Sequence, residues 1–147
     1  NPLPEGLNSE SVLKEMETFL GDQYQLPPMF SAKKIDGVLL YKMARKGKTV
    51  EREPRFIRIN KFELLRFESP EVDFRMSSSK GTYVRTVAHD LGKKLGCGAH
   101  LTSLRRTLID QFDLKEGKTL EAIEETPLSE FGDMLIPVHK AIPSHVL

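Results

Sequence analysis

The residues with the clearest capacity for chemistry lie together between Ser77 and Arg85. In this segment, Lys80 and Arg85 flank Tyr83 at the point where a predicted strand gives way to a predicted helix. The N-terminus of a helix offers unpaired N–H groups and the positive end of the helix dipole to an anion. The residue types therefore favour a phosphate or nucleotide site, and they are equally compatible with a polar entry to a helix.

Two other pairs of residues resemble parts of known functional sites, but neither pair is accompanied by the other residues that such a site needs. Ser77 and Lys80 have the spacing of a serine–lysine acyl transferase pair, but neither companion motif, Ser-Asp-Asn or Lys-Thr-Gly, follows them. Cys97 and His100 are two possible zinc ligands, whereas a structural zinc site needs four. We therefore predict no acyl transfer and no metal site.

Positive charge is concentrated in the middle of the chain. Residues 29–109 carry eighteen bases and eight acids, whereas both ends are acidic and the whole chain has a net charge of only +1. Within residues 29–48, cations alternate with aromatic side chains, namely Lys33, Lys34, Lys42, Arg45 and Lys46 with Phe30 and Tyr41. Arg105 and Arg106 add a further pair. Cations beside aromatics suit looped RNA, although a solvated basic hairpin has the same composition.

Length and composition set limits on the class of protein. The chain has 147 residues, 39% of them hydrophobic, which fits one globular domain, or one domain with a small appendage. No apolar run approaches the ~18 residues that a membrane span requires. The single cysteine excludes an intrachain disulfide and fits a reducing compartment, so we expect a cytoplasmic protein. Because the chain begins with Asn1 rather than methionine, we expect a processed chain or a piece of a longer one.

Hydrophobic periodicity predicts the elements that position these residues. Residues 8–11 look like the start of a helix whose apolar face comprises Val12, Met16, Phe19 and Leu20. Further helices are predicted over residues 38–45 and 84–95 and from residue 119. Strands are predicted over residues 56–67, with a bulge near residue 60, and over residues 72–76, with a possible third over 99–109. No linker separates two domains. The fold class is α/β (α+β), with a mixed, mainly antiparallel sheet and flanking helices.

Three ordered motifs resemble the TruB-type tRNA pseudouridine synthases of bacteria. They comprise residues 27–33 with 37–47, residues 79–86 with 90–92, and residues 96–100 with 104–107, so that the resemblance covers residues 25–112. It implies a pseudouridine synthase-like fold and an isomerase that converts the T-loop uridine of tRNA without a cofactor. It also implies that residues 29–48 form a thumb that clasps the tRNA T stem-loop.

The resemblance assigns roles to individual residues. Tyr83 would lie beside the target base, Arg85 would pair with the nucleophilic aspartate, and Leu104 would form an apolar wall of the pocket. A guanidinium keeps a partly buried carboxylate ionised and hence nucleophilic. The expected RNA-binding residues are Phe30, Lys33, Lys34, Tyr41, Lys42, Arg45, Lys46, Lys80, Arg105 and Arg106.

The chain departs from the family pattern at the nucleophile. The Gly-x-Leu-Asp-Pro-type motif expected upstream of the thumb is absent, and Asp90 matches a different family position. We expect residues 1–147 to be the C-terminal part of the catalytic domain, without a separate C-terminal RNA-binding domain and inactive alone. Its partners would be tRNA and the N-terminal half of the enzyme, and its exposed face would favour self-association. The alternatives are a stand-alone RNA-binding module and a protein-interaction domain.

Overall fold

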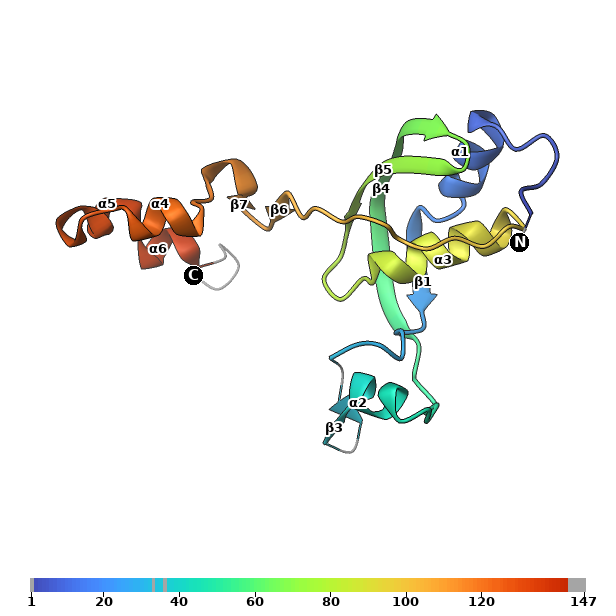
Figure 1. Ribbon diagram of the computed structural model, residues 1–147, viewed down its shortest axis with the longest axis horizontal. Helices are drawn as coiled ribbons and strands as arrows, with labels where there is room; N and C mark the ends of the chain where they lie inside the picture. Colours follow the sequence, from blue (N-terminus) through green and yellow to red (C-terminus); the bar gives the residue numbers. More distant parts are fainter. Residues whose placement is uncertain (1, 33, 36, 143–147) are drawn as a thin grey trace. The chain divides into compact units, whose positions relative to one another are not determined.

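The computed structural model describes residues 2–32, 34–35 and 37–142, which divide into two compact units (Figure 1). The first unit is Asn1–Ser103 and the second is Leu104–Leu147. The sequence contains no recognisable linker at this boundary and did not predict the division. None of the helices in the described ranges has the length and hydropathy needed to cross a membrane.

The first unit is built around a three-stranded antiparallel sheet. The order of its strands is β1-β4-β5, so the predicted pairing of the two central strands, β4 and β5, is confirmed together with the fold class. Strand β1 was not predicted. The elements of this unit are α1 (Ser9–Glu17), β1 (Gly21–Gln25), β2 (Lys34–Ile35), β3 (Val38–Leu39), α2 (Leu40–Arg45), β4 (Arg55–Glu68), β5 (Glu71–Ser78) and α3 (Val84–Lys94).

Helix α1 begins within the predicted start, with Asn8 as its cap. The Asn8 side chain accepts a hydrogen bond from the Ser11 N–H at 2.9 Å, and the Ser11 hydroxyl oxygen accepts one from the Asn8 N–H at 3.0 Å. This reciprocal capping box satisfies two amide groups that a helix start leaves unpaired. The prediction for Leu20 was wrong, because α1 ends at Glu17 and Leu20 is 48% exposed in the connection to β1.

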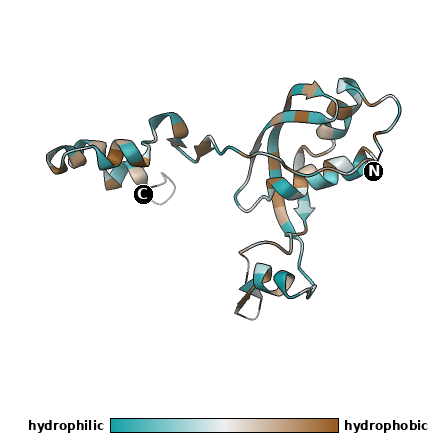
Figure 2. Ribbon diagram, in the orientation of Figure 1, coloured by the Kyte–Doolittle hydropathy of each residue, from teal (hydrophilic) through white to brown (hydrophobic). Residues whose placement is uncertain are grey.

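Strand β4 contains the predicted bulge. Its register against β5 shifts between Ile59 and Lys61, and a second shift between Leu64 and Arg66 was not predicted. Since a one-residue insertion reverses which side chains face the core, the first bulge places Ile59 and Phe62 on the same buried side. Figure 2 shows hydrophobic and hydrophilic residues alternating along the two long strands.

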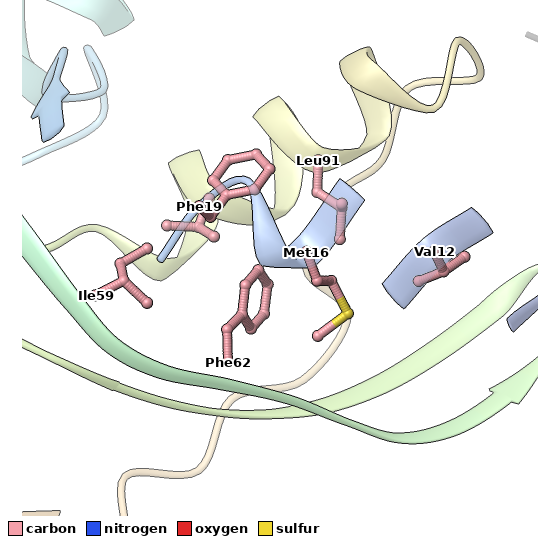
Figure 3. Close-up of a cluster of buried hydrophobic side chains, with 7 residues drawn as sticks. Val12, Met16, Phe19, Ile59, Phe62 and Leu91 are labelled. Atoms are coloured by element: carbon pink, nitrogen blue, oxygen red, sulfur yellow. The ribbon is translucent and has the colours of Figure 1, made fainter. Parts of the chain in front are cut away.

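The core joins both long helices to this sheet. Val12, Met16, Phe19, Ile59, Phe62, Val87 and Leu91 are buried in one cluster. In Figure 3, side chains from α1 and α3 meet those of β4. Phe62 makes edge-to-face contacts with Phe19 and Phe74, with ring centroids 6.0 and 5.1 Å apart. Burial of Val87 and Leu91 fixes α3 against the sheet, which confirms the predicted apolar face of that helix.

Residues 29–48, the predicted thumb, form a small hairpin followed by a helix. Strands β2 and β3 pair antiparallel through a turn in which Gly37 has a φ of 77°. The predicted helix over residues 38–45 therefore begins two residues later, because Val38 and Leu39 pair with β2. Helix α2 is anchored by the buried Leu40 and is followed by Gly47, with a φ of 69°. Asp36 lies outside the described residues.

The second unit contains short elements. They are β6 (Leu108–Ile109), β7 (Phe112–Asp113), the 3₁₀ turns η1 (Leu114–Glu116) and η2 (Leu128–Glu130), and the helices α4 (Leu120–Glu124), α5 (Phe131–Met134) and α6 (Val138–Ala141). The helix predicted from residue 119 is confirmed, with Thr119 as its cap. The strand considered over residues 99–109 is wrong except at its last two residues. Within this unit, no side chain among residues 104–142 is fully buried.

Candidate active site

The connection between β5 and α3 is held by local hydrogen bonds. The Ser79 N–H donates to the Arg58 carbonyl at 2.8 Å, and the Arg58 N–H donates to the Ser79 hydroxyl at 2.9 Å. The Thr82 hydroxyl donates to the Ser79 carbonyl at 2.9 Å. Gly81, with a φ of 84°, allows the reversal between these residues. The turn thus delivers Tyr83 to the start of α3 in a defined conformation.

Tyr83 is held through its backbone by a side chain from β1. The Gln25 side chain accepts a hydrogen bond from the Tyr83 N–H at 2.8 Å and donates one to the Tyr83 carbonyl at 3.2 Å. Gln25 is only 6% exposed. Sequence reasoning missed this residue, because a buried glutamine in an unpredicted five-residue strand carries no hydrophobic signal. Residues 83–85 are thereby tied to the end of β1.

Arg85 connects α3 to the beginning of the thumb. Its guanidinium donates to the Phe30 carbonyl oxygen at 2.8 Å, although the two residues are 55 positions apart. The Phe30 ring itself is 57% exposed. The structure therefore brings Phe30, a predicted RNA-binding residue, next to Arg85, which follows Tyr83 by two residues.

A pocket of about 330 Å³ lies beside Arg85. Its walls come from α3, from the chain entering the thumb and from the chain leaving it, and they comprise Leu26, Pro28, Arg52, Arg85, Thr86, His89 and Asp90. Two arginines and one carboxylate give this pocket a positive balance that favours an anion. In the described part of the chain, Asp90 makes no ion pair with Arg85 within 4.0 Å. The guanidinium is thus not already neutralised by that carboxylate.

Arg52 braces the same pocket. Its Nη1 donates to the Pro27 carbonyl at 2.8 Å, which links the chain leaving the thumb to the chain entering it. Its Nε and the Thr86 hydroxyl are buried and have no hydrogen-bond partner among the described residues. Buried polar groups are normally paired, so these two groups depart from the usual pattern.

The thumb presents its charged groups to solvent. Lys34, Lys42, Arg45 and Lys46 are exposed, and none forms an ion pair with a described residue. The Arg45 guanidinium lies 5.3 Å from the centre of the Tyr41 ring. Lys33, another predicted RNA-binding residue, lies outside the described residues. The thumb therefore combines exposed cations and aromatic rings, as the sequence pattern predicts.

Two other bases of the central segment form ion pairs within the fold. Arg58 pairs with Asp22 at 3.4 Å. Arg66 donates to three carboxylates at 2.6–3.1 Å, those of Glu68, Glu71 and Asp73. These contacts raise the pKa of Arg66, chiefly through the hydrogen bond and charge of Asp73. Arg58 and Arg66 thus differ from the thumb cations and from Lys80, which is exposed at the β5–α3 turn and forms no ion pair with a described residue.

The remaining predicted site residues belong to the second unit. Leu104, Arg105 and Arg106 are all exposed there. The roles assigned to them, an apolar wall of the pocket and contacts to RNA, stay predictions. Residues 2–32, 34–35 and 37–142 contain no group of three or more His, Cys, Asp or Glu side chains arranged to hold a metal ion.

Comparison with known proteins identifies the family of the chain. Residues 3–84 match the family described as "TruB family pseudouridylate synthase (N terminal domain)". Residues 85–142 match "tRNA pseudouridylate synthase B C-terminal domain". The chain therefore belongs to the TruB family of pseudouridylate synthases, and the family resemblance of its motifs is confirmed.

Named relatives extend the comparison. A tRNA pseudouridine synthase B of Opitutus terrae is 59% identical over 145 residues, which are 99% of this chain and 60% of that protein. One of Syntrophotalea carbinolica is 48% identical over 95% of this chain and 45% of its own length. The chain thus spans about half the length of these relatives. A chain in a crystal structure of a Cbf5–Nop10–Gar1 complex has a TM-score of 0.63 at 29% identity, covering 81% of this chain and 31% of that one.

Proposed function

We propose that this chain supplies the thumb and the tyrosine–arginine side of the active site in a tRNA pseudouridine synthase. The substrate is the T-loop uridine of tRNA, and the reaction is its isomerisation to pseudouridine. The observation that carries the proposal is the arrangement of Tyr83 and Arg85 at the head of a helix fixed in the core, with Arg85 bonded to the thumb at Phe30. Family membership supports the same reaction class.

The reaction requires a uridine that has left the stack of the loop. A base inside a stacked loop is inaccessible to a nucleophile, so the enzyme must flip it into a pocket. In the family reaction an aspartate then attacks the uridine, the glycosidic bond breaks, and the base rotates and rejoins through carbon 5. The proton on carbon 5 then leaves and the bond to the aspartate breaks, which restores the free carboxylate. This mechanism involves no metal or organic cofactor. Tyr83 stands at the head of α3, where a flipped base would meet its ring.

Arg85 holds the nucleophilic aspartate in this proposal. A guanidinium has five N–H donors, and the Phe30 carbonyl accepts only one of them. The remaining donors can bind a carboxylate in bidentate fashion, which lowers the carboxyl pKa and keeps the nucleophile ionised. The aspartate itself is expected from the motif that this chain lacks, so residues 1–147 contribute the partner of the nucleophile rather than the nucleophile.

The thumb binds the T stem-loop. Lys34, Lys42, Arg45 and Lys46 would contact phosphates, while Phe30 and Tyr41 offer ring faces to unstacked bases. Exposed cations without carboxylate partners suit this role, because no internal ion pair must be broken when RNA binds. The proposal thus separates a phosphate-binding thumb from a base-binding junction.

A chimaera tests the proposed function directly. In it, the present chain replaces the matching region of the 59% identical Opitutus terrae relative. We expect pseudouridine at the T-loop uridine of tRNA, measured by tritium release from uridine labelled at carbon 5. A folded chimaera that binds tRNA without isomerising it would instead favour the RNA-binding module. A folded chimaera that does not bind tRNA would favour the protein-interaction domain.

A further inference from the structure

Helix α3 starts at a residue that cannot cap it. Ser, Thr, Asp and Asn are preferred at this position because their short side chains pair with unsatisfied N–H groups of the first turn. Tyr83 occupies the cap of α3 and makes no side-chain capping hydrogen bond. The start of α3 thus lacks a stabilising side-chain hydrogen bond from its cap residue, and the Tyr83 ring is not used for capping.

Gln25 replaces the missing local contact from a distant part of the chain. In a capping box, the side chain three residues into the helix bonds the N–H of the cap residue. In α3 that residue is Thr86, whose buried hydroxyl has no partner among the described residues. The Tyr83 N–H instead donates to Gln25, which is 58 residues away and also binds the Tyr83 carbonyl.

The two hydrogen bonds with Gln25 involve both backbone polar groups of Tyr83, its N–H and its carbonyl. The Tyr83 carbonyl also accepts from the N–H groups of Thr86 at 3.0 Å and Val87 at 3.2 Å within α3. The bond from the Tyr83 N–H to Gln25 is therefore the restraint that only the sheet supplies. Gln25 is itself held, since it is 6% exposed and lies opposite Arg55 in the ladder between β1 and β4. The sheet therefore determines the backbone conformation from which the Tyr83 side chain departs, two residues before Arg85.

We infer that Gln25 is a positioning residue for the proposed isomerisation. This inference rests on the proposed function. Gln25 touches neither base nor nucleophile, but it sets the direction of Tyr83 and, through the first turn of α3, the place of Arg85. A displacement of about 1 Å in groups that orient a substrate can lower a rate about 100-fold. Loss of the clamp should therefore act on catalysis more than on binding.

The first test compares two glutamines of the same strand. Gln25→Leu removes both hydrogen bonds to Tyr83 at similar side-chain volume. Gln23→Leu is the matched control, because Gln23 also donates to a backbone carbonyl, that of Phe19 at 2.5 Å, away from the site. In the chimaera we expect Gln25→Leu to lower kcat roughly tenfold to 100-fold with KM within about threefold. Gln23→Leu should leave kcat within about twofold.

A second variant separates positioning from general stability. In Gln25→Glu, an ionised carboxylate can accept from the Tyr83 N–H but cannot donate to its carbonyl, whereas the protonated acid can do both. Burial raises the pKa of a carboxyl group, so protonation should return as pH falls. We expect kcat of Gln25→Glu, divided by that of the unsubstituted chimaera, to rise toward one at lower pH. This variant also serves if Gln25→Leu does not fold.

The outcomes distinguish the inference from the function on which it depends. Hydrogen exchange of the Tyr83 amide, measured in the full 147-residue chain, should accelerate in Gln25→Leu while amides of β4 and β5 keep their protection. Unchanged exchange, unchanged kcat in both Gln25 variants, or a pH-independent ratio would overturn the positioning role. An inactive unsubstituted chimaera would overturn the proposed function, and the exchange measurement would still decide whether Gln25 orders Tyr83.

Discussion

The Arg85 guanidinium donates a hydrogen bond to the Phe30 carbonyl oxygen at 2.8 Å, across 55 positions of the sequence. This contact joins a helix that is fixed in the core to the first residues of a basic thumb. Arg85 is nevertheless exposed, so its other N–H groups remain accessible to a ligand. One side chain thus links the thumb to the head of α3, the two parts of the chain to which RNA binding and catalysis are assigned in the proposed function.

The 147-residue chain should not form pseudouridine by itself. It contributes Arg85 but lacks the motif that carries the aspartate which this arginine would hold. Tritium release from labelled tRNA should equal that of a mock preparation. Turnover by the pure chain would mean that one of its own carboxylates is the nucleophile. Asp90 would then be the first candidate, because it lines the same pocket as Arg85.

The chain should bind a T stem-loop with an affinity that falls steeply with salt. Each phosphate that a thumb cation neutralises releases counterions, so removing a contact reduces the slope of log K against log salt by about one. Lys42→Ala combined with Lys46→Ala should therefore weaken all RNAs alike and reduce the slope by roughly two. Fluorescence titrations at several salt concentrations would measure both effects.

A control for this titration removes the same charge elsewhere. Lys14 on α1 and Lys93 on α3 are exposed lysines outside the thumb, so replacing both with alanine should change the slope little. Equal slopes for the two double variants, or binding that ignores salt, would exclude the thumb as the phosphate-binding surface.

The first unit should self-associate through its open sheet edge. Among the described residues, β1 pairs on one side only, with β4. The adjoining open face carries Tyr24 and Phe56, which are 74% and 60% exposed and pack edge to face. Exposed edges and apolar patches favour association. Sedimentation should show a mass that rises with concentration, and Tyr24→Ser with Phe56→Ser should reduce it. A strict monomer at high concentration would refute this expectation.

Stability of the first unit should depend on the contact between α1 and the sheet. Met16 is fully buried in the core, so Met16→Ala should lower the free energy of unfolding by about 2–5 kcal/mol. Leu13→Ala removes an exposed leucine from the same helix and should change it by no more than about 0.5 kcal/mol. Urea denaturation followed by circular dichroism would measure both. Equal losses would mean that α1 does not pack as described.

Local sequence signals predicted the elements whose causes are local. The helix start at residues 8–11, the bulge near residue 60 and the apolar face of α3 each depend on residues within a few positions of one another. Strand β1 escaped prediction because its interior-facing residues, Gln23 and Gln25, are polar. Their side chains bond backbone groups, those of Phe19 nearby and of the distant Tyr83. Leu20 was misplaced because periodicity does not show where a helix ends.

In the candidate site, too, features with local causes were predicted and features that depend on distant contacts were not. The sequence predicted site roles for Tyr83, Arg85 and the basic thumb, because a motif and a cluster of charges can be recognised without the tertiary structure. These roles stay predictions. The sequence did not predict the bond from Arg85 to Phe30, the clamp at Gln25 or the brace from Arg52 to Pro27. Each of these joins a side chain to a backbone group on another segment, so each depends on the tertiary arrangement.

The most direct test of the central claim is the single-turnover rate of the chimaera carrying Arg85→Lys. An ammonium keeps the charge but cannot bind a carboxylate with a planar fork while also reaching Phe30. We predict a loss of roughly 100-fold in the rate of pseudouridine formation, on the order seen when one stabilising donor is removed from an active site. Arg58→Lys, at the exposed pair with Asp22, should keep the rate within about twofold. Equal rates for Arg85→Lys and the unsubstituted chimaera would contradict the claim that Arg85 organises the active site.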